Sequence, residues 1–261
     1  MMGLSEIGLL GQSGYGIFVA LFFIGFLSAF LGSLGSGVVS SIAIPSMLML
    51  GIPPHLALAV LNAGTPGAAV GSFPNYYRAG KVLWRVSFIL AGLSLVGVTV
   101  GTSIVIRIES DVLHKIIGLS LMAMVPLLLI NRELGVKHLQ VSKKKRILGY
   151  IFYSIMCIGG GILAVGAGIV FVQIYMFFFG LTVLETKGTA TMPGVVGSIA
   201  GTVVFAISGI FNWHYVAAFF PGMMLGAWLG SKTALRLGDK KLKYLIIALV
   251  AAIGLYLFLR S

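Results

Sequence analysis

Residues 89–106, ILAGLSLVGVTVGTSIVI, decide the fold, because they form an apolar run of 18 residues without a charged side chain. A helix that crosses the hydrocarbon core of a bilayer needs about 20 such residues. Residues 112–130 and 242–259 are near-continuous apolar runs, each with one lysine close to its start, Lys115 and Lys243. None of the three alternates between apolar and polar residues as a strand of a membrane barrel does. We therefore predict an all-α membrane protein, since helices satisfy their own backbone groups in lipid.

Composition excludes a water-soluble globular domain. Of the 261 residues, 59% are hydrophobic and 9% are charged, whereas a soluble domain is about half apolar and about a quarter charged. The N-terminal stretch carries Glu6 and has no Lys or Arg before its first apolar run at residues 15–31, so we expect that run to be retained as a membrane span. The single cysteine, Cys157, lies in an apolar stretch and is expected to serve packing.

The apolar segments divide into two groups of five, which predicts a bundle of about 8–10 transmembrane helices. Residues 1–131 are expected to form a first transmembrane repeat, residues 132–146 a basic cytoplasmic linker, and residues 147–261 a second repeat. The predicted segments are 15–34, 37–50, 55–72, 85–106, 112–131, 147–165, 167–180, 187–208, 214–236 and 242–259.

An internal duplication is indicated by an ungapped offset of 129 residues. It aligns Gly80-x-x-x-Trp84 with Gly209-x-x-x-Trp213 and Gly97-x-x-x-Gly101 with Gly226-x-x-x-Gly230. The basic loop at residues 76–85, YYRAGKVLWR, then corresponds to residues 207–214, ISGIFNWH, which lack Lys and Arg. Since basic residues favour cytoplasmic loops, and since five segments is an odd number, the second copy is predicted to be inverted.

The same rule accounts for the net charge of +12. With the N-terminus outside and ten crossings, 15 of the 18 Lys and Arg residues fall on the cytoplasmic side. The charge is thus interpreted as a topology signal, and no nucleic-acid partner is expected.

Two short segments, 37–50 and 167–180, follow glycine-rich breaks with the sequences GSLGSG and GGGILAVGAG. Their positions predict two broken or re-entrant helices, with turns shaped by Gly35, Gly37, Gly166 and Gly168. The N-terminal N–H groups of such helices carry partial positive charge toward an anion near the midplane. The alternative is that these glycines only allow close helix packing, and the sequence does not decide whether the segments cross the membrane or re-enter.

Acidic residues lie only at segment ends or in loops, which disfavours an intramembrane acid–base enzyme and a cation carrier with a buried carboxylate. We predict no catalytic residue, metal ligand or cofactor. Lys187, at the start of its segment, either supplies a fixed positive charge or extends to the interface. Polar residues inside apolar segments are candidate substrate ligands, with interhelical hydrogen bonding as the alternative role; the substrate-binding set is Asn62, Thr65, Gln173, Thr189, Thr191 and Lys187.

Three stretches resemble the sulfite exporter TauE/SafE family: residues 50–84, LGIPPHLALAVLNAGTPGAAVGSFPNYYRAGKVLW; residues 180–198, GLTVLETKGTATMPGVVGS; and residues 222–232, GMMLGAWLGSK. Ser33 and Ser36 depart from the family's denser glycine run. The resemblance implies a multi-pass transporter of the plasma membrane for small sulfur-containing anions such as sulfite, thiosulfate or organosulfonates. We expect a secondary transporter that works by alternating access, with a passive anion channel as the alternative. Its expected partners are a small anion and the lipid bilayer, and its small-residue ridges permit a homodimer.

Overall fold

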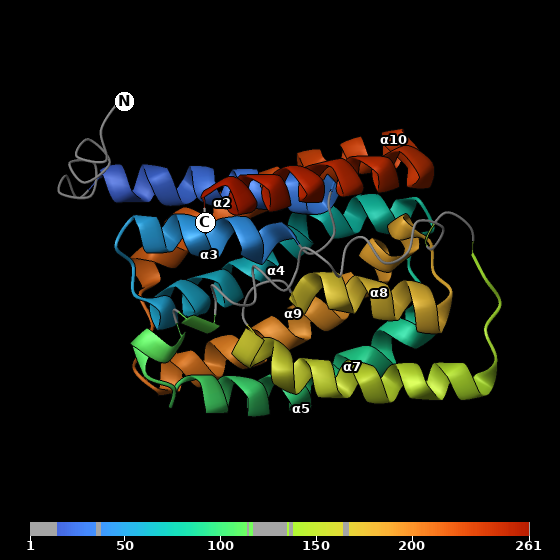
Figure 1. Ribbon diagram of the computed structural model, residues 1–261, viewed down its shortest axis with the longest axis horizontal. Coiled ribbons are helices and arrows are strands. Elements are labelled where there is room, and N and C mark those ends of the chain that lie inside the picture. The colour runs from blue at the N-terminus through green and yellow to red at the C-terminus, as the bar shows by residue number, and fades with distance from the viewer. Residues whose placement is uncertain are drawn as a thin grey trace.

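The protein is a bundle of helices. The computed structural model describes residues 15–34, 38–113, 115–116, 135, 138–163 and 167–260, with the backbone alone at 161–163, 167, 169 and 243–260. Every regular element within these ranges is helical (Figure 1), which confirms the predicted all-α class. The elements are α2 Gly16–Leu34, α3 Val38–Met49, α4 Pro54–Arg78, α5 Trp84–Val105, α7 Lys143–Leu163, α8 Ala167–Phe179, α9 Val183–Ile207 and α10 Trp213–Arg260.

Helix ends follow local chemistry. Pro54 opens α4, at a position where the missing proline N–H costs no intrahelical hydrogen bond. Gly80 and Gly209 follow α4 and α9 with φ of +64° and +73°, a left-handed conformation that favours glycine and ends a helix. Gly238 has φ 73° and ψ 167° and divides α10 into two helical parts, close to the predicted segments 214–236 and 242–259.

Some boundaries differ from the predicted ones. Helix α7 begins at Lys143, so the last four residues of the predicted linker are helical. The cause is local, because the hydroxyl of Ser142 accepts the N–H of Lys145 at 3.3 Å and satisfies one of the unpaired donors of the first turn. The predicted segment 112–131 lies mostly outside the described residues.

The helices have the length and surface of membrane spans. Within the described residues, α2, α4, α5 and α9 are long and apolar enough to cross a bilayer. Large apolar side chains face outward, among them Phe23 of α2, Val96 of α5 and Ile155 of α7, which are 55%, 65% and 59% exposed. An outer surface of this kind is unfavourable in water and suits contact with lipid. The protein is therefore an integral membrane protein.

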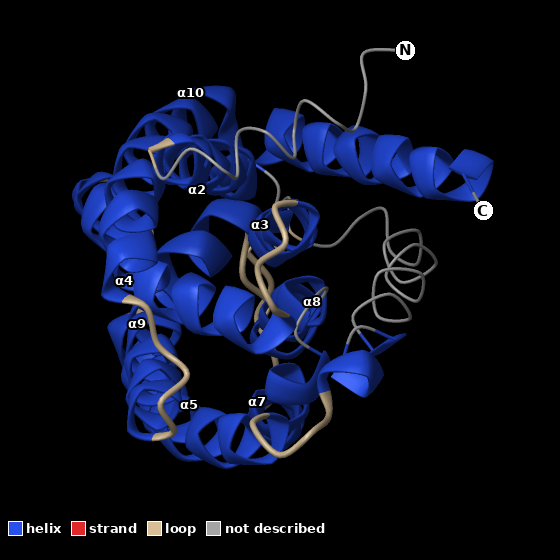
Figure 2. Cartoon of the chain, turned by 90° about the vertical axis from the view of Figure 1, so that its left-hand side faces the viewer, coloured by secondary structure: helices blue, strands red, loops and turns tan. Residues whose placement is uncertain are grey.

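The two short helices are α3, with 12 residues, and α8, with 13. At 1.5 Å per residue each is about 18–20 Å long, which is less than the hydrocarbon thickness of about 30 Å. They contact each other and lie side by side, beside a wall formed by α10, α4, α9 and α5 (Figure 2). Neither helix by itself spans a bilayer.

Rows of glycine on α10 and α5, which we call glycine ridges, bring these helices into backbone contact with their neighbours. On α10, a Cβ at Gly226 would overlap the carbonyl oxygen of Phe26 on α2, and Gly222 and Gly230 meet that helix in the same way. On α5, a Cβ at Gly101 would overlap the carbonyl oxygen of Ile158 on α7. Only glycine allows these approaches, so the ridges fix the spacing of the α2–α10 and α5–α7 pairs.

Helix bounds and helix partners recur with the 129-residue offset. Helices α4 and α9 begin and end 129 residues apart, and α5 and α10 begin 129 residues apart. Helix α10 packs on α2 and α4, while α5 packs on α7 and α9. The contacts of Tyr76 with Gly188 and of Asn62 with Gly201 show that α4 and α9 are antiparallel.

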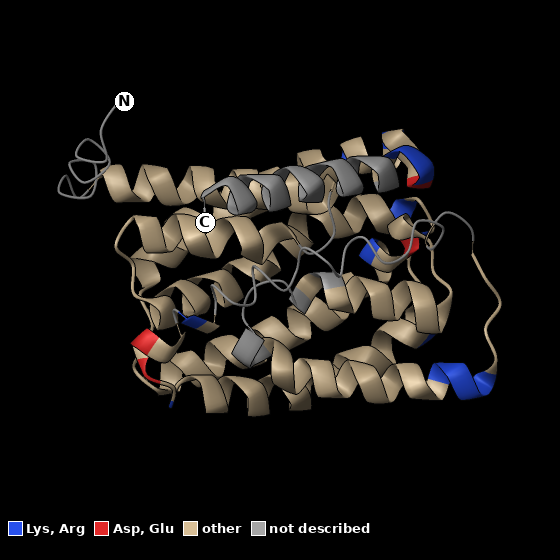
Figure 3. Cartoon of the chain, in the orientation of Figure 1, with Lys and Arg blue, Asp and Glu red and all other residues tan. Residues whose placement is uncertain are grey.

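Basic residues gather at the end of the bundle where α7 begins, together with some acidic residues, whereas acidic residues and few basic ones mark the opposite end (Figure 3). The end of α4, the start of α9 and the middle of α10 lie at the basic end (Figure 1). This clustering is the one that the charge pattern of the loops predicts.

Candidate functional site

A cavity of about 450 Å³ lies inside the bundle and is lined by residues of α2–α5 and α7–α10. We call it the central cavity. A second cavity of about 190 Å³ shares Asn62, Thr65 and Cys157 with it. Much of the lining is apolar, for example Val98 and Phe171. The polar side chains of the lining are Ser33, Ser40, Asn62, Thr65, Ser72, Tyr76, Ser94, Tyr153, Tyr175, Thr186, Lys187, Thr191 and Ser198.

Several predicted site residues meet in this cavity. Asn62 and Thr65 of α4 line it together with Lys187 and Thr191 of α9. Gly168 also lines it, from the first turn of α8, so that residue is helical and does not form the predicted turn. The other three predicted turn residues, Gly35, Gly37 and Gly166, lie outside the described residues.

Two predicted ligands lie elsewhere. Gln173 is half-buried on α8 and is not part of the cavity lining. Thr189 is fully buried, and its hydroxyl accepts the N–H of Leu83 at 3.1 Å. The carbonyl of Thr189 accepts the hydroxyl of Ser87 at 2.8 Å, because Pro193, four residues later, has no N–H to offer it. Thr189 therefore joins α9 to the start of α5.

Lys187 turns inward. Its Nζ donates to the carbonyl oxygens of Gly32, at 3.1 Å, and of Ser33, both in the last turn of α2. The last carbonyls of a helix lack intrahelical donors and carry partial negative charge, so a cation is favourable there. An ammonium group has three donors, and these two bonds leave one for a ligand. Of the two roles predicted for Lys187, the inward geometry fits a charge at the cavity and not extension to the interface.

Acidic partners of Lys187 are absent from the described part of the chain. The ion pair found there joins Glu185 to His138, with Oε2 and Nδ1 2.9 Å apart. No carboxylate of the described residues lies within ion-pair distance of Lys187, and none lines the central cavity.

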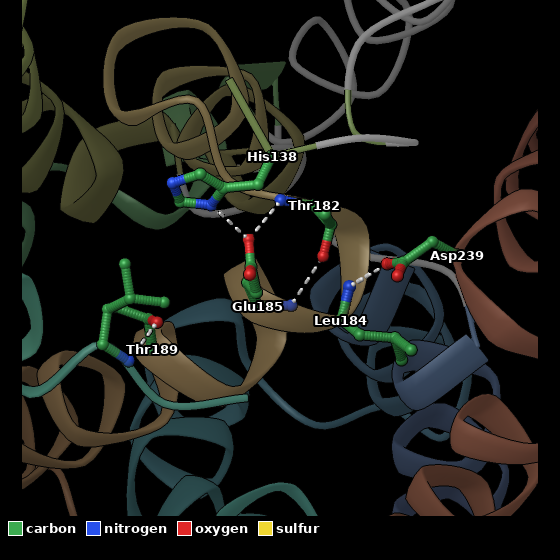
Figure 4. Close-up of polar contacts among 7 residues, drawn as sticks. His138, Thr182, Leu184, Glu185, Thr189 and Asp239 are labelled. Carbon is green, nitrogen blue, oxygen red and sulfur yellow. Dashed lines mark hydrogen bonds and ion pairs between the residues drawn. The ribbon is translucent and has the colours of Figure 1, made fainter. Parts of the chain in front are cut away.

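The carboxylates near Lys187 cap the start of α9 instead (Figure 4). Thr182 and Glu185 form a capping box, in which the Thr182 hydroxyl accepts the Glu185 N–H at 3.2 Å and Glu185 accepts the Thr182 N–H at 2.9 Å. Asp239, from α10, accepts the N–H of Leu184 at 2.7 Å. These bonds satisfy the first-turn donors and fix the turn that carries Thr186 and Lys187.

Five hydroxyls of the cavity lining are used as donors within their own helices, those of Ser33, Thr65, Ser72, Thr191 and Ser198. Thr65 donates to Leu61 at 2.9 Å, Thr191 to Lys187 at 2.9 Å and Ser72 to Ala68 at 2.8 Å, each to a carbonyl oxygen four residues earlier. A hydroxyl has a single hydrogen, so these groups are left to act as acceptors. Asn62 donates one amide N–H to the carbonyl of Leu58 at 2.9 Å and has a second.

Two buried hydroxyls in the cavity lining have no hydrogen-bond partner among the described residues, those of Tyr175 and Thr186. The sequence interpretation missed both. Tyr175 sits in an apolar run of aromatic residues, and Thr186 precedes Lys187 in a loop-like stretch. Nothing in either pattern distinguishes them from packing residues, because an unpaired donor can be recognised only from its surroundings.

The sequence also matches a known family model. Residues 17–257 match the model described as "Sulfite exporter TauE/SafE". The chain belongs to the sulfite exporter TauE/SafE family. The match covers all the helices described above except Gly16 of α2 and the last residues of α10, and it includes every residue that lines the central cavity.

Curated relatives of this TauE/SafE protein are named as transporters. "Probable membrane transporter protein YdhB" of Bacillus subtilis (strain 168) is 26% identical over 245 residues, which cover 92% of this chain and 98% of the relative. "Probable membrane transporter protein YfcA" of Escherichia coli (strain K12) is 23% identical over 238 residues, covering 90% and 87%. "Probable membrane transporter protein ORF9" of Sinorhizobium sp is 25% identical over 245 residues, covering 92% and 90%. No solved structure matches the chain.

Proposed function

We propose that this protein is a secondary transporter that moves small sulfur-containing anions across the plasma membrane by alternating access. The observation that supports it most is Lys187, a cation on the wall of an internal cavity that has no carboxylate partner in the described chain. A charge removed from water is costly unless it is paired. An anion in the central cavity would pair with Lys187, whereas a cation would be repelled.

Alternating access is supported by the relation between the two groups of helices. We propose that they are inverted copies, with α4 and α9 at the interface of the repeats. The antiparallel contact of α4 with α9 and their matching bounds agree with this arrangement. Asn62 and Thr191, which correspond at the 129-residue offset, line the same cavity from the two helices. Binding at a repeat interface around which the halves rock is typical of secondary transporters.

The chemistry of the cavity points to an anion, and sulfur enters through family membership. In the proposed orientation the basic end of the bundle faces the cytoplasm, in agreement with the clustering of Lys and Arg in Figure 3. The several long apolar helices suit a multi-pass protein.

Flux measurements on the purified full chain in proteoliposomes test the proposal. We expect uptake of sulfite, thiosulfate or methanesulfonate that saturates with concentration and that the same anion on the opposite side accelerates. Vesicles without protein are the control. Flux without such trans-stimulation would support a passive channel instead, and no flux of any of the three anions would refute the proposed substrate class.

A further inference from the structure

The hydroxyls of Thr186 and Tyr175 are the unusual groups of the central cavity. Both residues are 1% exposed, both line the cavity, and neither oxygen has a partner among the described residues. We infer that Thr186 and Tyr175 bind the transported anion directly, each donating its hydroxyl hydrogen to an oxygen of the anion beside Lys187. This inference rests on the proposed function and adds the groups that hold the ligand.

These two residues are selected because their hydroxyls still have a hydrogen to donate to a ligand. An oxyanion only accepts hydrogen bonds, so a ligand group must have a hydrogen to donate. The cavity hydroxyls of Thr65, Ser72 and Thr191 already donate theirs to backbone carbonyls. A buried hydroxyl without any partner costs free energy. Bonds from Thr186 and Tyr175 to a ligand would remove that cost, and bonds to a charged acceptor are stronger than bonds to a neutral one.

Their positions suit a shared ligand. Thr186 directly precedes Lys187 on α9, whose first turn is fixed by the capping bonds of Figure 4. Tyr175 reaches the cavity from α8, and its ring is held edge-on against Tyr153, with ring centroids 5.8 Å apart. The hydroxyl of Tyr153 is hydrogen-bonded to that of Ser94 at 2.8 Å, whereas the hydroxyl of Tyr175 has no partner with hydrogen-bond geometry among the described residues.

The ligand class is a small oxyanion. Lys187 is the cationic side chain of the cavity lining within the described chain, and the other titratable side chains there are Tyr76, Tyr153, Tyr175 and Cys157. Tyrosine and cysteine side chains are ordinarily neutral at neutral pH. An entering oxyanion would therefore meet one positive charge and two free hydroxyl donors on α8 and α9, without an opposing carboxylate from the described lining.

Thermal unfolding of the purified full chain, with and without added methanesulfonate or sulfite, tests the inference. Without anion, Thr186→Val and Tyr175→Phe should be at least as stable as the wild type, because each removes an unsatisfied buried group. With anion, each should show an apparent Kd raised about tenfold or more. Thr186→Ser, which keeps the hydroxyl, should bind with an affinity within about threefold of the wild type.

Matched controls carry hydroxyls that are already hydrogen-bonded. Thr202→Val makes the same chemical change on α9 at a hydroxyl bonded to its own helix and outside the cavity lining, and Tyr153→Phe removes a hydroxyl already bonded to Ser94. Both should leave the apparent Kd within about threefold of the wild-type value. Tyr153→Phe should also lower stability without anion, because Ser94 loses its partner.

The outcomes separate the inference from the proposed function. Wild-type affinity in both Thr186→Val and Tyr175→Phe would overturn the inference while leaving the proposed transport intact. Equal losses in Thr202→Val and Thr186→Val would also overturn it, since hydroxyls with and without a partner in the protein would then be equivalent. A wild-type protein that neither moves nor is stabilised by sulfite, thiosulfate or methanesulfonate would refute the proposed function, and the inference with it.

Discussion

Replacing Lys187 by methionine removes the cation from the central cavity and keeps an unbranched side chain of similar length. For an anion about 4 Å from the ammonium, the lost attraction is about 4 kcal/mol at an effective dielectric constant near 20, and about 1 kcal/mol if the cavity behaves as bulk water. These values correspond to affinity losses of about a thousandfold and about fivefold. The half-saturation concentration for anion uptake should therefore rise at least about fivefold in Lys187→Met.

The same substitution changes the end of α2. Methionine leaves the carbonyls of Gly32 and Ser33 without the donor that Lys187 provides, and an unsatisfied buried acceptor costs about 1–3 kcal/mol. Removing a charge that has no counter-ion favours the folded state and offsets part of that loss. Unfolding without anion is therefore measured first, so that a loss of uptake is compared at equal amounts of folded protein.

Lys232→Met is the matched control. Lys232 is exposed, lies over the ring of Trp228 at 3.6 Å from the ring centroid, and is not part of the cavity lining. Initial rates of methanesulfonate uptake into proteoliposomes, at a series of concentrations, give the half-saturation values of both variants. If Lys187→Met keeps a half-saturation value within about twofold of the wild type, Lys187 does not pair with the anion and the reasoning is refuted.

Three further predictions concern the scaffold and are checked by unfolding of the full chain in detergent. Gly226→Ala should lower Tm or prevent folding because its Cβ would overlap the carbonyl of Phe26, whereas Gly92→Ala, with nothing within 4 Å, should be tolerated; equal effects would contradict the role of the ridge. Thr182→Ala should cost about 1 kcal/mol by removing the α9 cap, and the exposed Thr233→Ala less than about half of that. Ser87→Ala should cost about 1–3 kcal/mol because the Thr189 carbonyl loses its donor; a loss no larger than that of the exposed Ser208→Ala would disprove this.

The class of fold could be predicted because the bilayer imposes it on composition and run length. A run such as residues 89–106 must be helical in lipid, since no water is present to satisfy its backbone groups. Most predicted helix ends lie near the observed ones for a similar local reason. Proline, glycine and capping side chains determine where a helix begins or ends through the backbone of the same turn. The start of α7 at Lys143 was missed. The hydroxyl of Ser142 caps this helix only when residues 143–145 are already helical, and the run of lysines there gave no apolar signal for a helix.

The candidate site could be predicted only in part. Asn62, Thr65, Lys187 and Thr191 line one cavity, and their polarity within apolar segments was the signal. Polarity alone could not show that the hydroxyls of Thr65 and Thr191 donate their hydrogens to backbone carbonyls of their own helices. It also gave no reason to select Tyr175, whose hydroxyl is notable only because it is buried without a hydrogen-bond partner among the described residues.

Thr186 and Thr189 show most directly what the tertiary structure decided. They lie three residues apart on one helix, and the sequence pattern indicated Thr189 as a substrate ligand but not Thr186. Thr189 meets the backbone N–H of Leu83, about a hundred residues earlier in the chain, and so joins two helices. The hydroxyl of Thr186 has no such partner among the described residues, and Thr186 is part of the cavity lining together with Lys187. The sequence by itself determined that the chain folds as helices in a membrane, because that depends on each segment and its solvent. Which polar groups remain free for a ligand depends on the distant segments packed against them, and only the tertiary structure supplies those neighbours.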